Sequence, residues 1–434
     1  MVKVTFLGAG SVFAPRLSLD IFLIPGLSEG EFHLVDIDEE RLKLSYETTQ
    51  VIREKYGKGW RVFATTDRRK ALPKSDFVIN CIEVSGLETV RFDYEIPLKY
   101  GVDQCIGDTI GPGGIMKALR TVPPWVEILK DIEELAPEAI VLNYTNPMSI
   151  MTLTAYRVSS LKVVGLCHSV QGTSRQLAEY LNVPYEELRW QCAGINHMAW
   201  FTELRFKGED MYPLLKKKVR EDKELYEKDP VRFEVMLYFG YFVSESSGHL
   251  SEYLPYFRKR KELIKRYCRE GYRGESGFYA RNWPKWRREL DLWRERVIKG
   301  EEEVKPERSY EYASQIIEGV VLDRPQVIYG NVLNKGFIAN LPQDQVVEVA
   351  CLVDGRGVTP TYFGELPPQC AALCRSNMAV YELTVEGILE KSYEKILQAL
   401  LLDPLTSAVC SLEEAKRMLD ELLEAEKEFV PSLK

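Results

Sequence analysis

The sequence predicts an α/β fold that begins with a doubly wound, mostly parallel sheet. Short runs rich in Val, Ile, Leu and Phe alternate with helix-like segments through the first half of the chain. A glycine-rich turn follows the first of these runs, and polar residues follow several of the others. Such alternation is typical of parallel sheets with helices on both faces, and ligands bind at the carboxyl ends of their strands.

The stretch "KVTFLGAGS" predicts a buried strand followed by a tight turn. Gly8 and Gly10 would let the backbone approach a pyrophosphate at the start of the next helix, and Ser11 could cap that helix. Phe13 stands where a third glycine is common, so this motif alone is weak. Together with the alternation around it, the turn predicts a Rossmann-like unit that binds a dinucleotide.

The stretch "EFHLVDIDEERL" predicts a second strand that ends at Asp36. A carboxylate at this place accepts a hydrogen bond from the adenosine ribose and disfavours a 2′-phosphate, which favours NAD over NADP. The alternative is that Asp36 or Asp38 caps the helix expected to begin near Glu39.

Further strands are expected over Phe77 to Ile82, over Ala139 to Leu142 and in "LKVVGLCHSV". The second of them leads into "NYTNP", where Asn143 is expected to face the cofactor and Asn146 to lie at the crevice. Asn-Pro is also common turn chemistry, so a purely structural role stays open.

Two strand ends carry sulfur and imidazole groups. Cys167 and His168 follow one strand, and His197 follows another in "QCAGINHMAW". A single cysteine or histidine is most often a packing residue, but three such residues at strand ends, in a chain with only four histidines, favour function. One thiolate and one imidazole are too few for a closed structural zinc site. They leave positions for substrate oxygens, and the mixed donors are compatible with Mn²⁺ or another divalent cation.

The 434 residues exceed the usual size of one hydrophobic core, so two domains, or one domain with large elaborations, are expected. Strict alternation fades after Gly194, where long charged helices appear. "QVIYGNVLNKGFIANLPQDQVVEVACLVD" predicts three strands, and "LEEAKRMLDELLEAEKEF" predicts a C-terminal helix. We therefore predict an NAD-binding domain over 1–194 and a mixed α+β domain for substrate binding and oligomerisation over 195–434.

Composition argues against several classes of protein. The net charge of −8 and the lack of a basic cluster disfavour nucleic acid as a partner. The sequence contains no run of eighteen apolar residues, so no membrane-spanning helix is expected. The N-terminus lacks the layout of a signal peptide. Nine cysteines without a repeating framework predict free thiols in the cytoplasm.

The sequence resembles glycoside hydrolase family four, the NAD- and metal-dependent glycosidases, over almost its whole length. The motifs that carry the resemblance are "GAGS", "VDIDEERL", "IGPGGIMKALRTVP", "NYTNPM", "GLCHSVQGT", "CAGINHMAW", "ESSGHLSEY", "IYGNV" and "NLPQDQVVEVACLVD". Members acting on 6-phospho-sugars carry Asn or Asp after the cysteine, where this chain has His168. This difference implies an unphosphorylated substrate. Within the family, "CHSVQGT" and "CAGINHMA" are most similar to the α-galactosidase (melibiase) branch, which implies α-galactosides as substrates, with α-galacturonidase or α-glucosidase activity as the alternative.

The resemblance also implies a mechanism without net redox change. NAD⁺ takes a hydride from C3 of the sugar, the resulting ketone acidifies the C2 proton, and a metal held by Cys167 and His197 stabilises the enediolate. A base removes the C2 proton, the aglycone leaves C1, water adds, and NADH returns the hydride. His168 would assist the leaving oxygen or bind a sugar hydroxyl. Tyr253 is the expected base, with Glu245 and Glu252 as alternatives.

Other roles follow from the resemblance alone. Asn146 would contact sugar and cofactor, and Asp108 would lie near sugar hydroxyls or the metal. A uronate substrate needs a cation, for which the candidates are Arg16, Arg91 and the cluster 258–260. His249 would lie near the site, in the core or at a subunit contact. The family implies a small α-glycoside as the binding partner and homodimers or homotetramers as the assembly.

Two rival classes share the predicted fold or cofactor. An NAD dehydrogenase of the malate or lactate type carries an Asp-x-x-Arg motif that orients its histidine and needs no cysteine. No such motif precedes "GINH", and Cys167 would be unexplained. A protein that only senses NAD would need neither metal nor thiolate.

Overall fold

The computed structural model describes every residue from 1 to 434. The strands are β1 (Val2–Leu7), β2 (Glu29–Val35), β3 (Gly59–Thr65), β4 (Phe77–Asn80), β5 (Ile140–Asn143), β6 (Lys162–Leu166), β7 (Leu188–Ile195), β8 (Met198–Phe206), β9 (Glu209–Asp210), β10 (Phe242–Val243), β11 (Gln326–Leu333), β12 (Val346–Asp354) and β13 (Gly357–Pro360).

The α-helices are α1 (Phe13–Phe22), α2 (Glu39–Tyr56), α3 (Arg68–Ala71), α4 (Gly86–Lys99), α5 (Gly111–Leu135), α6 (Met148–Val158), α7 (Ser169–Leu181), α8 (Tyr212–Glu221), α9 (Lys223–Lys228), α10 (Pro230–Phe239), α11 (Ser247–Tyr253), α12 (Lys261–Tyr267), α13 (Phe278–Lys299), α14 (Tyr312–Leu322), α15 (Pro368–Glu390), α16 (Tyr393–Leu402), α17 (Pro404–Val409) and α18 (Leu412–Ala425). Short 3₁₀ turns cover Tyr185–Glu187 and Gly271–Arg273.

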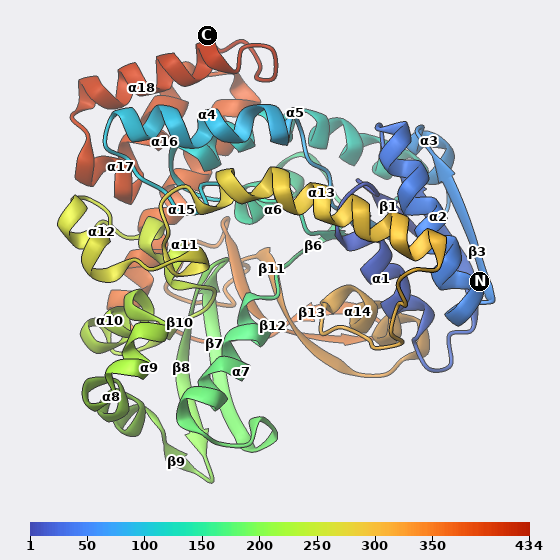
Figure 1. Ribbon diagram of the computed structural model, residues 1–434, viewed down its shortest axis with the longest axis horizontal. Coiled ribbons are helices and arrows are strands. Elements are labelled where there is room, and N and C mark those ends of the chain that lie inside the picture. The colour runs from blue at the N-terminus through green and yellow to red at the C-terminus, as the bar shows by residue number, and fades with distance from the viewer.

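A single thirteen-stranded sheet runs through the molecule (Figure 1). Its first half has the strand order β3-β2-β1-β4-β5-β6, and every neighbouring pair in it is parallel. This order, with helices in the crossovers, is that of a doubly wound dinucleotide-binding sheet. The predicted Rossmann-like fold class is therefore confirmed.

The strands of the second half extend the same sheet. β11 pairs antiparallel with β6, and β12, β7, β8 and β10 follow in antiparallel order. Because β11 lies beside β6, residues near 330 contact the strand that leads into Cys167. The domain boundary predicted at residue 194 remains a prediction.

The prediction of three strands between residues 326 and 354 is wrong, because the structure has two, β11 and β12. The intervening segment is a loop built around the buried side chain of Asn334. Its amide nitrogen donates to the carbonyls of Ile338, Leu341 and Pro342 at 2.9–3.1 Å. A segment whose carbonyls are satisfied by one side chain needs no partner strand.

The helices pack on both sides of the sheet and form one large apolar core with it. A smaller cluster lies where α7, α8 and α10 cover the β7–β8 hairpin, which extends away from the parallel half (Figure 1). The predicted C-terminal helix is confirmed as α18. Ser411 and Glu414 form a capping box at its N-terminus. None of the helices combines the length and apolar character that crossing a membrane requires.

Candidate active site

The glycine turn after β1 is held at the carboxyl edge of the parallel strands. Gly8 has a φ of +79°, and a Cβ on it would lie 2.3 Å from the carbonyl oxygen of Cys81. Only glycine fits there, which explains the residue type at this position. The N–H of Gly10 donates to Asp36 at 2.6 Å, so the carboxylate at the end of β2 fixes the turn.

The two aspartates after β2 have different roles. Asp38 is the N-cap of α2 and accepts from the N–H of Arg41, whereas Asp36 accepts from Gly10 and Asp38. The expectation that Ser11 caps the next helix is wrong, because α1 begins at Phe13 after Val12. The Ser11 hydroxyl is buried without a hydrogen-bond partner, which leaves it free for a ligand.

Asn143 lies at the end of β5, fully buried, and its amide serves the protein itself. Its oxygen accepts from Asn80 at 2.8 Å, and its nitrogen donates to the carbonyl of Thr145 at 3.0 Å. These bonds hold the turn that carries Asn146. Its contact with cofactor stays a prediction.

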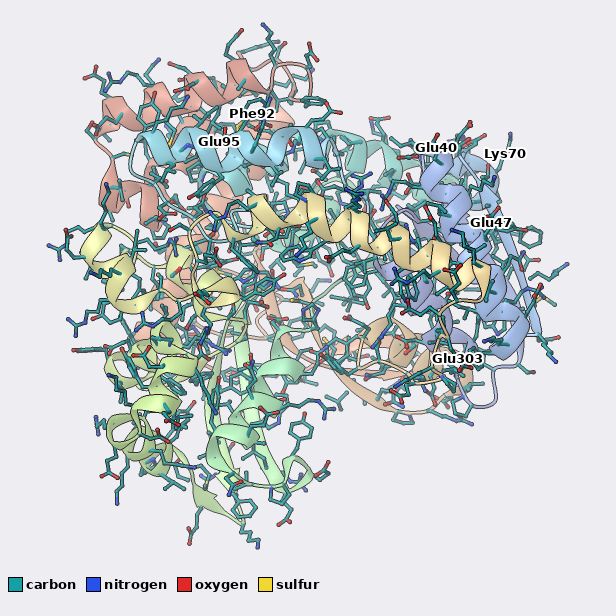
Figure 2. The ribbon with its side chains drawn as sticks, in the orientation of Figure 1. Glu40, Glu47, Lys70, Phe92, Glu95 and Glu303 are labelled. Atoms are coloured by element: carbon teal, nitrogen blue, oxygen red, sulfur yellow. The ribbon has the colours of Figure 1, made fainter.

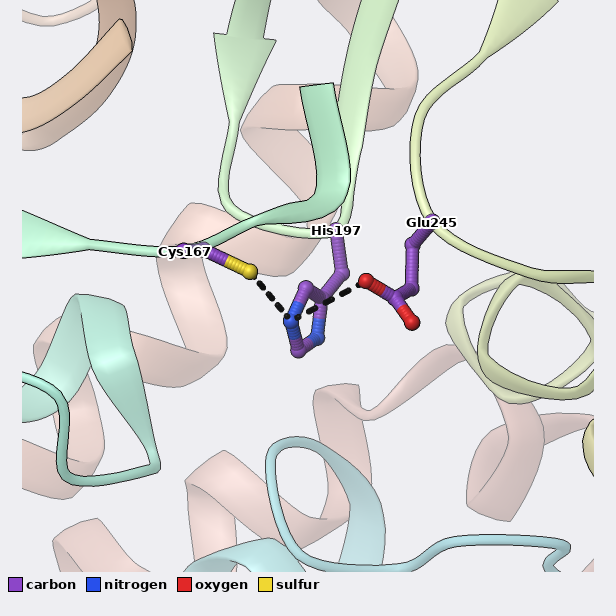
Figure 3. Close-up of side chains that lie close together, drawn as sticks. All are labelled: Cys167, His197 and Glu245. Carbon is purple, nitrogen blue, oxygen red and sulfur yellow. Dashed lines mark hydrogen bonds and ion pairs between the residues drawn. The ribbon is translucent and has the colours of Figure 1, made fainter. Parts of the chain in front are cut away.

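Cys167 and His197 meet although thirty residues separate them. Cys167 directly follows β6, and His197 lies in the two-residue turn between β7 and β8. The Cys167 sulfur lies 3.4 Å from Nε2 of His197 (Figure 3). His197 has a φ of +62°, which is uncommon for a residue other than glycine and clusters at functional sites.

Glu245 completes a group of three metal-ligand types. Its carboxylate lies 3.7 Å from His197 Nε2, and the three ligand atoms all lie within 4.8 Å of one another (Figure 3). Glu245 follows β10 and also has a positive φ, of +75°. Its N–H donates to Thr173 of α7, which in turn accepts from the buried Arg232.

The protonation states of this cluster suit a divalent cation. Burial lowers the pKa of His197 to about 4, so its imidazole is neutral near pH 7. Burial alone would raise the pKa of Glu245, but the neighbouring histidines outweigh it and lower this pKa to about 2. Burial raises the pKa of the Cys167 thiol, so binding a cation would release its proton. A thiolate, a neutral imidazole and a carboxylate fit Mn²⁺ or Zn²⁺ with positions left open.

A second histidine stands beside this cluster. The His249 ring lies 4.5 Å from the His197 ring, and its Nδ1 lies 3.4 Å from Glu245. Ser246 Oγ lies 3.0 Å from the same nitrogen. His249 therefore lies in the site, whereas His33 on β2 stacks on Phe63 of the edge strand β3.

His168 points to a partner different from that of Cys167. Its side chain is half exposed, and its Nδ1 lies 3.4 Å from Glu311, which precedes α14. This carboxylate outweighs burial and raises the pKa of His168 to about 9. The imidazolium is thus present near neutral pH and can donate a proton.

Asp108 and Asn146 lie together next to the cluster. Asn146 donates to Asp108 at 3.1 Å, and the ammonium of Lys117 lies 3.7 Å from the same carboxylate and 2.9 Å from Glu83. Burial would raise the pKa of Asp108, but Lys117, His249 and hydrogen bonds lower it. The side chains thus present an ionised carboxylate and an amide to a polar ligand.

The structure separates the three base candidates. Glu252 accepts from the N–H groups of Cys105, Ile106 and Gly107 at 2.6–3.0 Å, so it holds a loop. Glu245 belongs to the ligand cluster. The Tyr253 ring lies 6.3 Å from His197, and its hydroxyl is buried without a partner. Burial raises the pKa of Tyr253, so a nearby cation must offset this before it can act as a base.

Arg91 is not brought to the cluster. It is exposed on α4, and its guanidinium stacks over Phe92 at 4.5 Å. Three residues that sequence reasoning did not assign to these places are Glu245 as a ligand, Glu311 beside His168 and Lys117 beside Asp108. No local pattern marks them, because each reaches the site by a contact between distant segments.

The fold and the cluster together define an enzyme class in which a dinucleotide and a metal ion act side by side. A model of the Family 4 glycosyl hydrolases matches residues 3–183, and one of the Family 4 glycosyl hydrolase C-terminal domain matches residues 192–406. The chain therefore belongs to the family 4 glycosyl hydrolases.

Individual relatives agree with this assignment. An α-galactosidase of Bacillus subtilis (strain 168) is 41% identical, and the match covers 100% of both chains. An α-galactosidase of Rhizobium meliloti (strain 1021) is 39% identical over 99% of this chain and 89% of its own. The structure of the Thermotoga maritima 6-phospho-β-glucosidase with manganese, NAD⁺ and glucose-6-phosphate superimposes with a TM-score of 0.80, at 25% identity and full coverage of both chains.

Proposed function

We propose that this glycoside hydrolase is an α-galactosidase acting on unphosphorylated α-galactosides, with NAD and a divalent cation such as Mn²⁺ as resident cofactors. The observation that carries the proposal is the convergence of Cys167, His197 and Glu245 at the strand edge that also bears the glycine turn. Full-length similarity to α-galactosidases supports the choice of sugar.

The charges around the site favour a sugar that is neutral at C6. A phosphate or a uronate needs a cation that no protein carboxylate already neutralises. A narrow cavity beside Asp108 is lined by two cations, Lys117 and Arg120. Lys117 forms ion pairs with Glu83 and Asp108. Arg120 forms ion pairs with Asp93 and Glu426. Arg258, one of the cations considered for a uronate, is buried against Asp103. These paired cations favour a galactoside over a galacturonide.

Each cofactor would supply one kind of chemistry. Bound NAD supplies a hydride acceptor at C3 that returns the hydride later, and a bound divalent cation supplies a Lewis acid for the sugar oxygens. Cys167, His197 and Glu245 would hold the cation. Asp108 and Asn146 would fix the sugar hydroxyls by accepting and donating hydrogen bonds.

Proton transfers would use the chain's own groups. His168, kept protonated by Glu311, would donate to the leaving oxygen at C1. Tyr253 would accept the C2 proton, because Glu252 is committed to backbone N–H groups and Glu245 to the cation.

Exchange of His168 for Asn should slow the hydrolysis of alkyl galactosides much more than that of nitrophenyl galactosides, because a nitrophenolate leaving group needs no proton. An equal loss on both would instead make His168 a binder of a sugar hydroxyl.

A panel of nitrophenyl α-glycosides tests the substrate class. With Mn²⁺, NAD⁺ and a reductant present, kcat/KM for the α-galactoside should exceed that for the α-glucoside, the α-galacturonide and the 6-phospho-α-galactoside by at least about tenfold. A higher kcat/KM for the galacturonide would overturn the proposal in favour of a uronidase. NADH accumulating from a hydroxy acid would favour a dehydrogenase.

A further inference from the structure

We propose that α13 clamps the glycine turn and that Arg294 is the positioning residue that makes the clamp, so that the dinucleotide is released slowly. The inference rests on the proposed function only in taking NAD as the ligand of this turn. It concerns how the chain keeps its cofactor between the two hydride transfers.

Arg294 contacts the turn from a helix that is nearly 300 residues away in the sequence. Its side chain is fully buried, its Nη1 donates to the carbonyl of Gly10 at 3.1 Å, and its Nη2 donates to that of Ser11. These carbonyls belong to the turn that leads into α1, whose first N–H groups would face a pyrophosphate, since the N–H groups of residues 8 to 11 are bonded within the protein. A guanidinium that binds both carbonyls fixes the orientation of the peptide groups between them.

Asp291 and Arg41 complete the contact. Asp291 accepts from Arg294 at 3.3 Å and from Arg41 of α2 at 2.7 Å, and Arg41 donates a further hydrogen bond to Gly10. Burial and the nearby Arg41 lower the pKa of Arg294 to about 10. The two Nη atoms of the buried Arg294 are bonded to the turn carbonyls and to Asp291, whereas its Nε has no protein partner, so this contact is made by the ends of the guanidinium and is not a solvated helix face.

The segment after α13 continues around the same unit. Tyr56 at the end of α2 donates to the carbonyl of Val304 at 2.7 Å, and the N–H of Ser309 donates to Asp20 of α1 at 2.7 Å. Figure 2 shows Glu303 beyond the end of α13, on the side of the molecule where α2 lies. The chain from 278 to 311 is thus a strap over the turn, α2 and α1, and it ends at the residue that pairs with His168.

The proposed reaction gives such a strap a purpose. NADH formed in the first hydride transfer must stay bound until it returns the hydride to the same sugar. If the dinucleotide left in between, the oxidised sugar could not be restored. A turn held by a buried guanidinium is preorganised for the cofactor, and preorganisation strengthens binding by reducing what must be ordered on association.

Release of NADH measures the clamp directly. Protein loaded with NADH, without sugar or metal, is mixed with excess NAD⁺, and the decay of NADH fluorescence is followed by stopped flow. Arg294→Met should release NADH at least about tenfold faster than the wild type, because loss of charge-assisted hydrogen bonds is worth about a factor of ten or more. Arg294→Lys should lie between them. Lys285→Met, which removes an exposed cation from the same helix, should not change the rate.

Further outcomes separate the clamp from a purely structural role. Because NADH must stay bound until it returns the hydride, Arg294→Met should also accumulate free NADH during turnover of the sugar, whereas the wild type should not. Asp291→Asn, a milder change at a partly exposed residue, should accelerate release in the same direction even if Arg294→Met folds poorly. Unchanged NADH release in Asp291→Asn and Arg294→Met overturns the clamp alone. A wild-type protein that binds no NADH overturns both the clamp and the proposed function.

Discussion

Cys167→Ser should lower kcat by at least about a thousandfold while leaving the affinity for NAD⁺ within about twofold. Serine is a far weaker ligand than a thiolate, so the cation and its Lewis acidity are lost, and a thousandfold corresponds to about 4 kcal/mol of barrier. The affinity for NAD⁺ should persist because the glycine turn follows β1, whereas Cys167 follows β6. Strands β4 and β5 lie between β1 and β6, which sets these two strands about 14 Å apart. Metal content by atomic absorption, kcat and NAD⁺ titration measure the three quantities.

Cys410→Ser is the matched control for this change. Cys410 is another half-buried free thiol, but it lies in the C-terminal helical layer against the carbonyl of Tyr100. It should keep wild-type kcat and metal content. Full activity of Cys167→Ser, or an equal loss in Cys410→Ser, would contradict the assignment of Cys167 to the cation.

Glu245→Gln should weaken Mn²⁺ binding by at least about tenfold and shift the Mn²⁺ dependence of activity by the same factor. Glutamine keeps the size of the side chain but removes the negative charge that the cluster offers a cation, and loss of even an outer ligand partner costs about 10–100-fold in affinity. Activity should recover in part when Mn²⁺ is raised. An Mn²⁺ titration of kcat/KM, with NAD⁺ saturating, checks this.

The shape of that titration also decides between two roles for Glu245. If kcat fell at every Mn²⁺ concentration while the midpoint stayed unchanged, Glu245 would be the proton acceptor and not a ligand. Glu318→Gln serves as control, because Glu318 is a carboxylate of similar burial that pairs with Arg308 and Arg324 away from the cluster. It should leave the midpoint in place.

The parallel half of the sheet was predictable because its signals are local. Buried strands such as β4 and β5 appear in the sequence as short apolar runs. Gly8 indicates a turn because glycine tolerates a positive φ, and Asp38 indicates a helix start because its side chain can cap a helix. The segment after β11 has a similar apolar pattern that also predicts a strand, yet it is a loop. The Asn334 side chain donates to the carbonyls that a neighbouring strand would otherwise bind. A run of apolar residues does not reveal this.

The candidate site was predictable only for residues at strand ends. Cys167 and His197 follow strands, so their meeting follows from the topology of a parallel sheet and its extension. Glu245 reaches them through the pairing of β10 with β8, and Glu311 reaches His168 from the strap after α13. Such contacts between distant segments depend on tertiary packing, which carries no signal in the local sequence.

The exchange of hydrogen at C2 of the sugar tests the central claim most directly. When nitrophenyl α-galactoside is hydrolysed in D₂O with NAD⁺ and Mn²⁺, the galactose released should carry deuterium at C2, because the proton removed there is replaced from solvent. Tyr253→Phe should abolish both turnover and exchange if its hydroxyl accepts that proton. Galactose formed by the wild-type protein with only hydrogen at C2, as judged by NMR and mass spectrometry, would contradict the oxidation and elimination route.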